Sequence, residues 1–191
     1  MNADALPDEL PVVFVDHPFP DAYRDLVDGR AQVVGPDDGL ASAEALLVGA
    51  ARRWDAAAFA FAPRARVISR VGVGYDNVDV ADATAAGVTV CNTPLAPTVS
   101  TAEHTMALIL AVTKHLPEQV ARARQGLRAI PVGRALELDT GTLGLIGIGR
   151  IASRVAVAAH GLGMQVLATD PLVTEPPVPG VELVPLDELL A

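Results

Sequence analysis

Cysteine, lysine and aromatic residues are scarce in this 191-residue chain, and it has no long apolar run. Cys91 is the only cysteine, which excludes an internal disulfide and a cysteine-based zinc site; we expect no metal, and we expect Cys91 to be a small buried residue. Lys114 is the only lysine and the net charge is −9, so nucleic-acid and anionic membrane surfaces are not expected partners. The longest apolar stretch, 106–112, is far shorter than the roughly 20 residues of a membrane-spanning helix.

The chain has ample material for a folded core, because 51% of its residues are hydrophobic and only 19% are charged. Residues 1–11 carry acidic side chains and no basic one, which is unlike a secretory signal. Together with the single cysteine, this composition predicts a soluble, cytoplasmic protein.

Strand-like and helix-like segments alternate through the first half of the chain, which predicts an α/β fold with a parallel sheet covered by helices. The expected strands are 11–16, 31–35, 45–49, 65–71 and 88–91, and the expected helices are 21–27, 55–61 and 80–86. The third strand overlaps a helical pattern that begins at Ala41, so its assignment stays open.

The pattern changes at Ser100, where Ser100 and Glu103 form a capping box that predicts a helix to about His115. Nearly all of residues 106–112 are apolar, so we expect this helix to be buried on all sides as a connection between two domains. A more polar helix over 116–127 and a loop over 129–140 follow.

A glycine-rich turn between a strand over 142–146 and a helix over 150–160 is the most specific local motif. Gly147 and Gly149 allow a sharp turn and close approach of a pyrophosphate, which would rest on the helix N-terminus. Ala152 takes the place of the third glycine, where a small side chain is sufficient. The pattern indicates dinucleotide binding; a glycine-rich turn in an ordinary α/β unit is the alternative.

Asp170 ends the next expected strand, 164–169, at about 20 residues beyond the glycine turn. A carboxylate at this place accepts hydrogen bonds from the adenosine ribose and repels a 2′-phosphate, so the sequence favours NAD over NADP. Its alternative role is to cap the turn before Pro171. A third strand of this half is expected over 181–184.

Three further motifs complete an ordered set. They are Ser69-Arg70-Val71-Gly72-Val73-Gly74-Tyr75-Asp76-Asn77-Val78-Asp79, Val90-Cys91-Asn92-Thr93-Pro94 and Ala102-Glu103-His104. With the glycine turn and Asp170, they resemble the D-isomer-specific 2-hydroxyacid dehydrogenases, the group that includes phosphoglycerate dehydrogenase and glyoxylate/hydroxypyruvate reductase. The resemblance runs from about Val12 to the end of the chain. Relatives of alanine dehydrogenase or adenosylhomocysteinase, also two-domain NAD enzymes, fit these motifs poorly.

The resemblance implies a flavodoxin-like substrate domain over residues 1–98 and the first half of a Rossmann-type NAD-binding domain over 99–191. It implies that the backbone amides of Val73 and Gly74 hold the substrate carboxylate, as paired N–H donors can. It places Thr98 near the nicotinamide and the backbone of Arg150 and Ile151 at the pyrophosphate. The cofactor-binding set is therefore Thr98, Gly147, Gly149, Arg150, Ile151 and Asp170.

Several of these residues have structural alternatives. Gly72 and Gly74 could serve a turn that needs positive φ, and Asp76 and Asn77 could satisfy their own turn. Thr98 could simply lead into the following helix. Substrate identity is not predicted, because Ala96 stands where some members of the family place a larger side chain over the substrate.

The implied reaction is hydride transfer between NAD and C2 of a small D-2-hydroxy or 2-keto acid. The family's catalytic histidine, glutamate and arginine follow later strands, so none of the catalytic residues lies in this chain. We interpret His104 as a satisfied structural histidine. Neither Ser100 with His104 nor His160 with Asp170 has the third partner of a nucleophilic triad.

The resemblance thus predicts an NAD-dependent oxidoreductase, present here as an inactive N-terminal fragment of a protein that forms a homodimer when full-length. The alternative is a non-catalytic NAD-binding module, similar to the corepressors that resemble this family.

Overall fold

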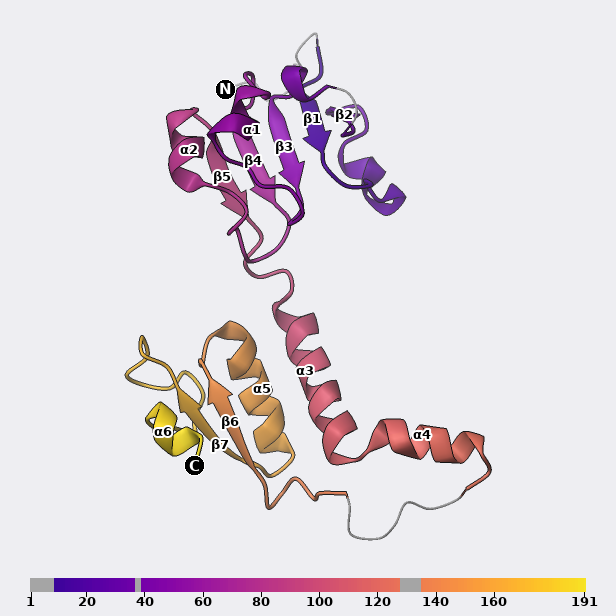
Figure 1. Cartoon of the computed structure of the whole chain (residues 1–191), viewed down its shortest axis with the longest axis vertical. Helices are drawn as coiled ribbons and strands as arrows, with labels where there is room; N and C mark the ends of the chain where they lie inside the picture. Colours follow the sequence, from indigo (N-terminus) through magenta and orange to yellow (C-terminus); the bar gives the residue numbers. More distant parts are fainter. Residues whose placement is uncertain (1–8, 37–38, 128–134) are drawn as a thin grey trace. The chain divides into compact units, whose positions relative to one another are not determined.

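The computed structural model describes residues 9–36, 39–127 and 135–191, which fold into two compact units, Met1–Ala96 and Pro97–Ala191 (Figure 1). The sequence places its domain boundary close to this division, after residue 98. Each unit has its own sheet and its own core.

The first unit is built, within the described residues, on five parallel strands in the order β2-β1-β3-β4-β5. The strands are β1 (Val12–Val15), β2 (Gln32–Val34), β3 (Ala45–Val48), β4 (Val67–Arg70) and β5 (Thr89–Asn92). Helices α1 (Ala56–Ala60) and α2 (Val80–Ala85) pack on each other. Because the order reverses after β1, the carboxyl ends of β1 and β3 form a topological switch point, where open α/β sheets bind ligands.

Aspartate side chains begin both helices of this unit. Asp55 accepts a hydrogen bond from the amide of Ala58, and Asp79 accepts one from the amide of Asp82. These N-caps satisfy amides that the first helical turn leaves unpaired. The backbone of Trp54 also pairs with the loop before α2, through hydrogen bonds with Asn77 and Asp79. Both helices therefore start at defined points beside the sheet.

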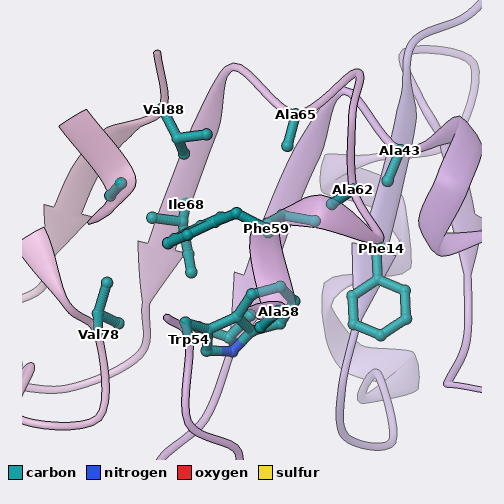
Figure 2. Packing of buried hydrophobic residues seen from close by; sticks show 13 residues of the cluster. Phe14, Ala43, Trp54, Ala58, Phe59, Ala62, Ala65, Ile68, Val78 and Val88 are labelled. Carbon is teal, nitrogen blue, oxygen red and sulfur yellow. The ribbon is translucent and has the colours of Figure 1, made fainter. Parts of the chain in front are cut away.

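Trp54 lies at the centre of the first core (Figure 2). Its side chain is fully buried, and its ring centroid lies 6.2 Å from that of Phe14 and 5.9 Å from that of Phe59. Ile68 from β4 joins the same cluster, together with alanines from α1 and its flanking turns. Three aromatic rings of this unit are thus gathered at one place in its core.

The second unit has three parallel strands within the described residues, in the order β6-β7-β8. They are β6 (Thr142–Ile146), β7 (Gln165–Thr169) and β8 (Val181–Leu183), and the helices are α3 (Thr98–Thr113), α4 (Leu116–Arg124), α5 (Arg150–Gly161) and α6 (Leu186–Leu189). Helix α5 packs on β7 and on α3, and α6 also packs on β7. The structure confirms the predicted α/β class with parallel sheets.

The predicted capping box at Ser100 is wrong. Helix α3 begins at Thr98, directly after Pro97, and no side chain caps it. Ser100 lies inside the first turn, where its hydroxyl donates back to the carbonyl of Pro97. Proline is tolerated at a helix N-terminus, because the N–H that it lacks would have no intrahelical partner there. The helix therefore begins directly after Pro97, earlier than the capping residues suggested.

The predicted burial of α3 on all sides is also wrong. Ala102 is its only buried residue among those described, whereas the side chains of Leu108 and Val112 are 53% and 74% exposed. The reason is that the helix packs mainly against a single neighbour in its own unit, α5, so most of its surface has no cover there.

Two smaller expectations differ as well. The segment 21–27 forms a 3₁₀ helix over Asp21–Leu26 instead of a regular helix, and it buries no residue, so packing does not stabilise a longer helix. Cys91 is exposed rather than buried, because β5 is an edge strand and Cys91 alternates with Val90, which packs on the core.

Residues 1–8, and the part of the predicted 129–140 loop up to residue 134, lie outside the described residues. Of the helices described, none is long and apolar enough to span a membrane.

Candidate functional site

The glycine turn joins β6 to α5 and is bonded to the end of β7. Gly147 has a φ of +88°, a left-handed conformation that glycine adopts without strain. Its amide donates a hydrogen bond of 2.7 Å to the carbonyl of Thr169. The side chain of Ile148 is only 1% exposed and joins the second core. The turn is therefore held from beneath by the sheet.

The outer side of the turn is open. Gly149 is the N-cap of α5 and has no side-chain cap, and a Cβ atom at either glycine of the turn would meet no atom within 4 Å. None of the described residues accepts a hydrogen bond from the amides of Gly149, Arg150 or Ile151. Free amides at the positive end of a helix dipole bind anions. Both the space and the donors fit a pyrophosphate group.

Asp170 lies directly after β7 and faces the same turn. Its Oδ2 accepts a hydrogen bond from the amide of Ile148 at 3.0 Å, and its Oδ1 accepts one from the amide of Leu172 at 2.9 Å. The bond from Ile148, and to a lesser degree that from Leu172, lowers the pKa of the Asp170 carboxyl because it stabilises the charged form. These bonds favour the anionic side chain, and the bond from Leu172 also caps the turn at Pro171.

A pocket of about 800 Å³ lies at the carboxyl ends of the three strands of the second unit. Its lining comes from the ends of β6, β7 and β8 and the start of α6: Ile146, Gly147, Thr169, Asp170, Pro171, Leu172, Leu183, Val184, Pro185 and Leu186. Open parallel sheets bind nucleotides at this edge. The structure thus brings Gly147 and Asp170 together in one pocket, with mainly apolar walls that suit an adenosine.

The other predicted cofactor residues do not line this pocket. Gly149 and Arg150 are exposed, and Ile151 is half-buried in the first turn of α5. Thr98 is the first residue of α3 and is also half-buried, which matches its alternative role as the start of that helix.

The second predicted turn follows β4 in the first unit. Gly72 has a φ of +122°, whereas Gly74 does not have a positive φ, so only one of the two glycines needs its conformational freedom. The amide of Gly72 donates to the Thr93 hydroxyl at 2.7 Å, and Asn92 donates to the carbonyl of Val73 at 2.8 Å. No described residue accepts a hydrogen bond from the amides of Val73 and Gly74. The turn is anchored through its other groups and leaves these two donors free.

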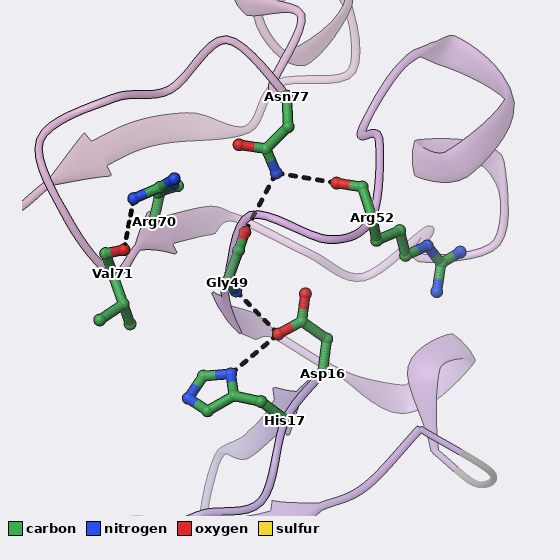
Figure 3. Close-up of polar contacts among 7 residues, drawn as sticks. All are labelled: Asp16, His17, Gly49, Arg52, Arg70, Val71 and Asn77. Atoms are coloured by element: carbon green, nitrogen blue, oxygen red, sulfur yellow. Dashed lines mark hydrogen bonds and ion pairs between the residues drawn. The ribbon is translucent and has the colours of Figure 1, made fainter.

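A polar cluster around Asp16 and Asn77 holds the loops at the carboxyl edge of the first sheet (Figure 3). Most of this cluster was not identified from the sequence. Asp16 follows β1 and accepts hydrogen bonds of 2.8 Å from the Gly49 amide and from His17. Asn77 donates to the carbonyls of Gly49 and Arg52, so it joins two loops instead of satisfying only its own turn. A signal was available for Asp16, because an acid at the end of a buried strand is the same pattern that singled out Asp170.

The remaining polar candidates do not form a catalytic site. His104 is exposed on α3 and has no hydrogen-bond partner among the described residues, so its interpretation as a satisfied structural histidine is wrong. Asp170 bonds to backbone amides and not to His160. Within the described ranges, no group of three or more histidine, cysteine or acidic side chains is arranged to hold a metal.

Residues 36–174 match the family model of the D-isomer specific 2-hydroxyacid dehydrogenase catalytic domain. The chain belongs to this family of oxidoreductases. The match spans the loops that follow β3, β4 and β5 in the first unit and the glycine turn with Asp170 in the second.

Curated relatives within the 2-hydroxyacid dehydrogenase family support the same assignment. The D-3-phosphoglycerate dehydrogenase of Mycobacterium tuberculosis is 39% identical over 193 residues, which cover 95% of this chain and 36% of the relative. That of Bacillus subtilis is 39% identical over 148 residues, covering 76% of this chain and 28% of the relative. The chain therefore spans about a third of the length of these relatives.

Solved structures of the family share the fold. The Aquifex aeolicus D-lactate dehydrogenase, in complex with NAD and lactic acid, has a TM-score of 0.82 and 30% identity, with 94% of this chain and 57% of that protein covered. A Thermus thermophilus protein has a TM-score of 0.83 and 32% identity, with 94% and 61% covered.

Proposed function

We propose that this chain provides the adenosine and pyrophosphate part of an NAD site, and the substrate-carboxylate site, of an NAD-dependent D-2-hydroxyacid dehydrogenase. The observation that carries the proposal is the open glycine turn. Its free amides and the carboxylate of Asp170 lie at the carboxyl edge of a parallel sheet. The family membership and the NAD complex of the Aquifex aeolicus relative support it.

Different groups of the second unit would bind different parts of NAD. The amides of Gly149, Arg150 and Ile151 would hold the pyrophosphate, and Asp170 would accept hydrogen bonds from the ribose hydroxyls. The Asp170 carboxylate, whose pKa is lowered by its backbone hydrogen bonds, repels a 2′-phosphate, which favours NAD over NADP. When bound, NAD supplies the hydride acceptor at its nicotinamide ring.

In the first unit, the free amides of Val73 and Gly74 would bind the carboxylate of a small 2-hydroxy or 2-keto acid. Two adjacent N–H donors hold such an anion without a charged side chain. We keep Thr98 as a candidate neighbour of the nicotinamide.

We expect a polypeptide of these 191 residues to bind but not to turn over substrate, since the residues that the family resemblance makes catalytic are not among them. A homodimer is part of the proposal, and the exposed apolar side chains of α3, such as Leu108 and Val112, support it. No feature of the described residues favours the corepressor-like alternative.

The Gly149→Ala variant tests the cofactor site directly. Gly149 has ordinary backbone angles and open space at its Cβ position, so alanine fits the folded chain but places a methyl group where the pyrophosphate would lie. We expect NADH affinity, measured by calorimetry, to fall at least about tenfold, because one displaced charged hydrogen bond is worth about 1.5–3 kcal/mol.

Gly161→Ala is the matched control, because Gly161 also has open space and lies at the far end of the same helix. This variant is expected to bind NADH like the unmodified chain. Equal affinity of all three proteins would contradict the proposed site, and so would tighter binding of NADPH than of NADH.

A further inference from the structure

Asp170 is bonded to the chain itself, and this points to a role besides ribose recognition. The two amides that its carboxylate accepts belong to different segments: Ile148 lies in the glycine turn and Leu172 in the loop after β7. We propose that Asp170 is a positioning residue that holds the glycine turn in its pyrophosphate-binding geometry before the cofactor arrives. This inference rests on the proposed function and extends it from the ribose to the turn.

Two consecutive amides of the turn are tied to the end of β7. The amide of Gly147 donates to the Thr169 carbonyl, and the amide of Ile148 donates to Asp170. The next amides, from Gly149 to Ile151, have no acceptor among the described residues. Asp170 therefore decides where the bonded part of the turn ends and where the anion-binding part begins.

The carbonyl side of the turn has its own partner, because the Ser153 hydroxyl donates to the carbonyls of Ile148 and Gly149. The Ile148 side chain anchors the turn in the core, but among the described residues only Asp170 accepts a hydrogen bond from the Ile148 amide, and both glycines have open space around their Cβ positions. Glycine loses more conformational freedom on ordering than any other residue. A fixed acceptor for the Ile148 amide reduces the ordering that binding must supply, which is the general advantage of a preorganised site.

The positioning role and the ribose role are compatible in a carboxylate. Its two oxygens offer about four acceptor sites, of which the chain uses two, so two remain for the ribose hydroxyls. An asparagine offers one acceptor oxygen and an NH₂ donor, which would face one of the two backbone donors. The lowered pKa of Asp170 agrees with a carboxylate that is bonded in its charged form.

A ligand lacking the ribose diol separates the two roles. We would measure by calorimetry the binding of ADP and of 2′,3′-dideoxy-ADP to the full chain and to its Asp170→Ala variant. If Asp170 positions the turn, the variant binds dideoxy-ADP about tenfold more weakly than the unmodified chain does, since the loss of one charged hydrogen bond is felt at the turn. If Asp170 serves only the ribose, both proteins bind dideoxy-ADP equally, and the proposal is overturned.

Glu175→Ala is the control, because Glu175 is an exposed acid in the same loop and no described residue bonds to its side chain. It is expected to leave both affinities unchanged. Asp170→Asn is expected to lose dideoxy-ADP affinity in the same direction as Asp170→Ala.

A measurement on the unmodified, ligand-free chain makes the test independent of variant folding. We expect the NMR amide proton shift of Ile148 to follow the titration of Asp170, with a midpoint below the ordinary aspartate pKa of about 3.9. An Ile148 amide that does not titrate would overturn the positioning role. Absence of ADP binding to the unmodified chain would instead contradict the proposed function, and the Ile148 titration would then decide the positioning role alone.

Discussion

Asp16 and Asp170 occupy equivalent places in the two units. Each follows the end of a parallel strand, and each accepts a hydrogen bond from an amide that follows the neighbouring strand: Gly49 at 2.8 Å for Asp16 and Ile148 at 3.0 Å for Asp170. Where parallel strands end, their ladder of hydrogen bonds stops and leaves amides without partners. A short acidic side chain reaches these amides, so it fixes the loops that carry the candidate sites.

At the same scale, we expect truncation of the Trp54 side chain to lower the stability of the first unit more than any other single truncation. Its ring is fully buried between Phe14 and Phe59, while its Nε1 has no hydrogen-bond partner among the described residues. We expect Trp54→Ala to lower the free energy of unfolding by about 3–5 kcal/mol, because it leaves a large cavity. Urea unfolding followed by circular dichroism would measure the change.

Trp54→Phe is the matched variant, since it keeps an aromatic ring in the core and removes only the unpartnered NH with part of the volume. We expect the loss in free energy of unfolding for Trp54→Phe to be less than half of that for Trp54→Ala. Equal stability of Trp54→Ala and Trp54→Phe would show that an aromatic ring at this position does not stabilise the core.

At the scale of elements, the helices differ in what starts them and in what holds them. α1 and α2 begin at aspartate N-caps, whereas α5 begins at Gly149 without a side-chain cap. The amphipathic α5 nevertheless buries Val155, Ala156 and Ala159, and the two alanines join the second core. Packing therefore stabilises α5, and its uncapped amides stay available for an anion.

The contact between α6 and β6 depends on the absence of a side chain at Gly144. A Cβ atom there would lie 3.3 Å from Leu189, the only residue of α6 that is not exposed. We expect Gly144→Val to displace α6 and to speed amide hydrogen exchange in residues 186–190, because the larger γ carbons cannot share this space. Exchange in β7 should change little.

Thr142→Val is the control, since Thr142 lies on the same face of β6 and is exposed. It adds no volume near Leu189 and should leave exchange in α6 unchanged. Unchanged exchange in the Gly144→Val variant would show that Leu189 can shift without loss of the contact.

At the scale of the whole molecule, two units carry different halves of the proposed chemistry. The first offers free amides at Val73 and Gly74 for a carboxylate, and the second offers the pocket with Asp170 for a nucleotide. Neither unit contains, within its described residues, a histidine paired with an acid and a third partner. His17 bonds to Asp16 through Nδ1, but no described residue bonds to its other ring nitrogen.

We therefore expect the purified 191-residue polypeptide to show no NADH oxidation with glyoxylate, hydroxypyruvate or pyruvate, measured by the absorbance of NADH. A positioned acid–base group alone contributes about 10²–10⁴-fold in rate. The family resemblance places both this group and the electrophilic arginine outside these residues. Lactate dehydrogenase assayed in the same buffer is the positive control. Measurable turnover by this chain would show that some residue described above acts as the missing acid.

The sequence by itself determined the features that depend on residue type and local spacing. Glycines at 147 and 149, an acid after the next strand and alternating apolar segments are enough to specify the parallel α/β fold and the turn, because few residues satisfy those backbone demands. The tertiary structure alone decided burial and long-range bonding. Cys91 is exposed because its strand lies at an edge, α3 is exposed because its unit covers it from one side, and Asp170 binds Ile148 because β6 and β7 end side by side. Such outcomes depend on which strands and helices are neighbours, and local sequence patterns do not encode that.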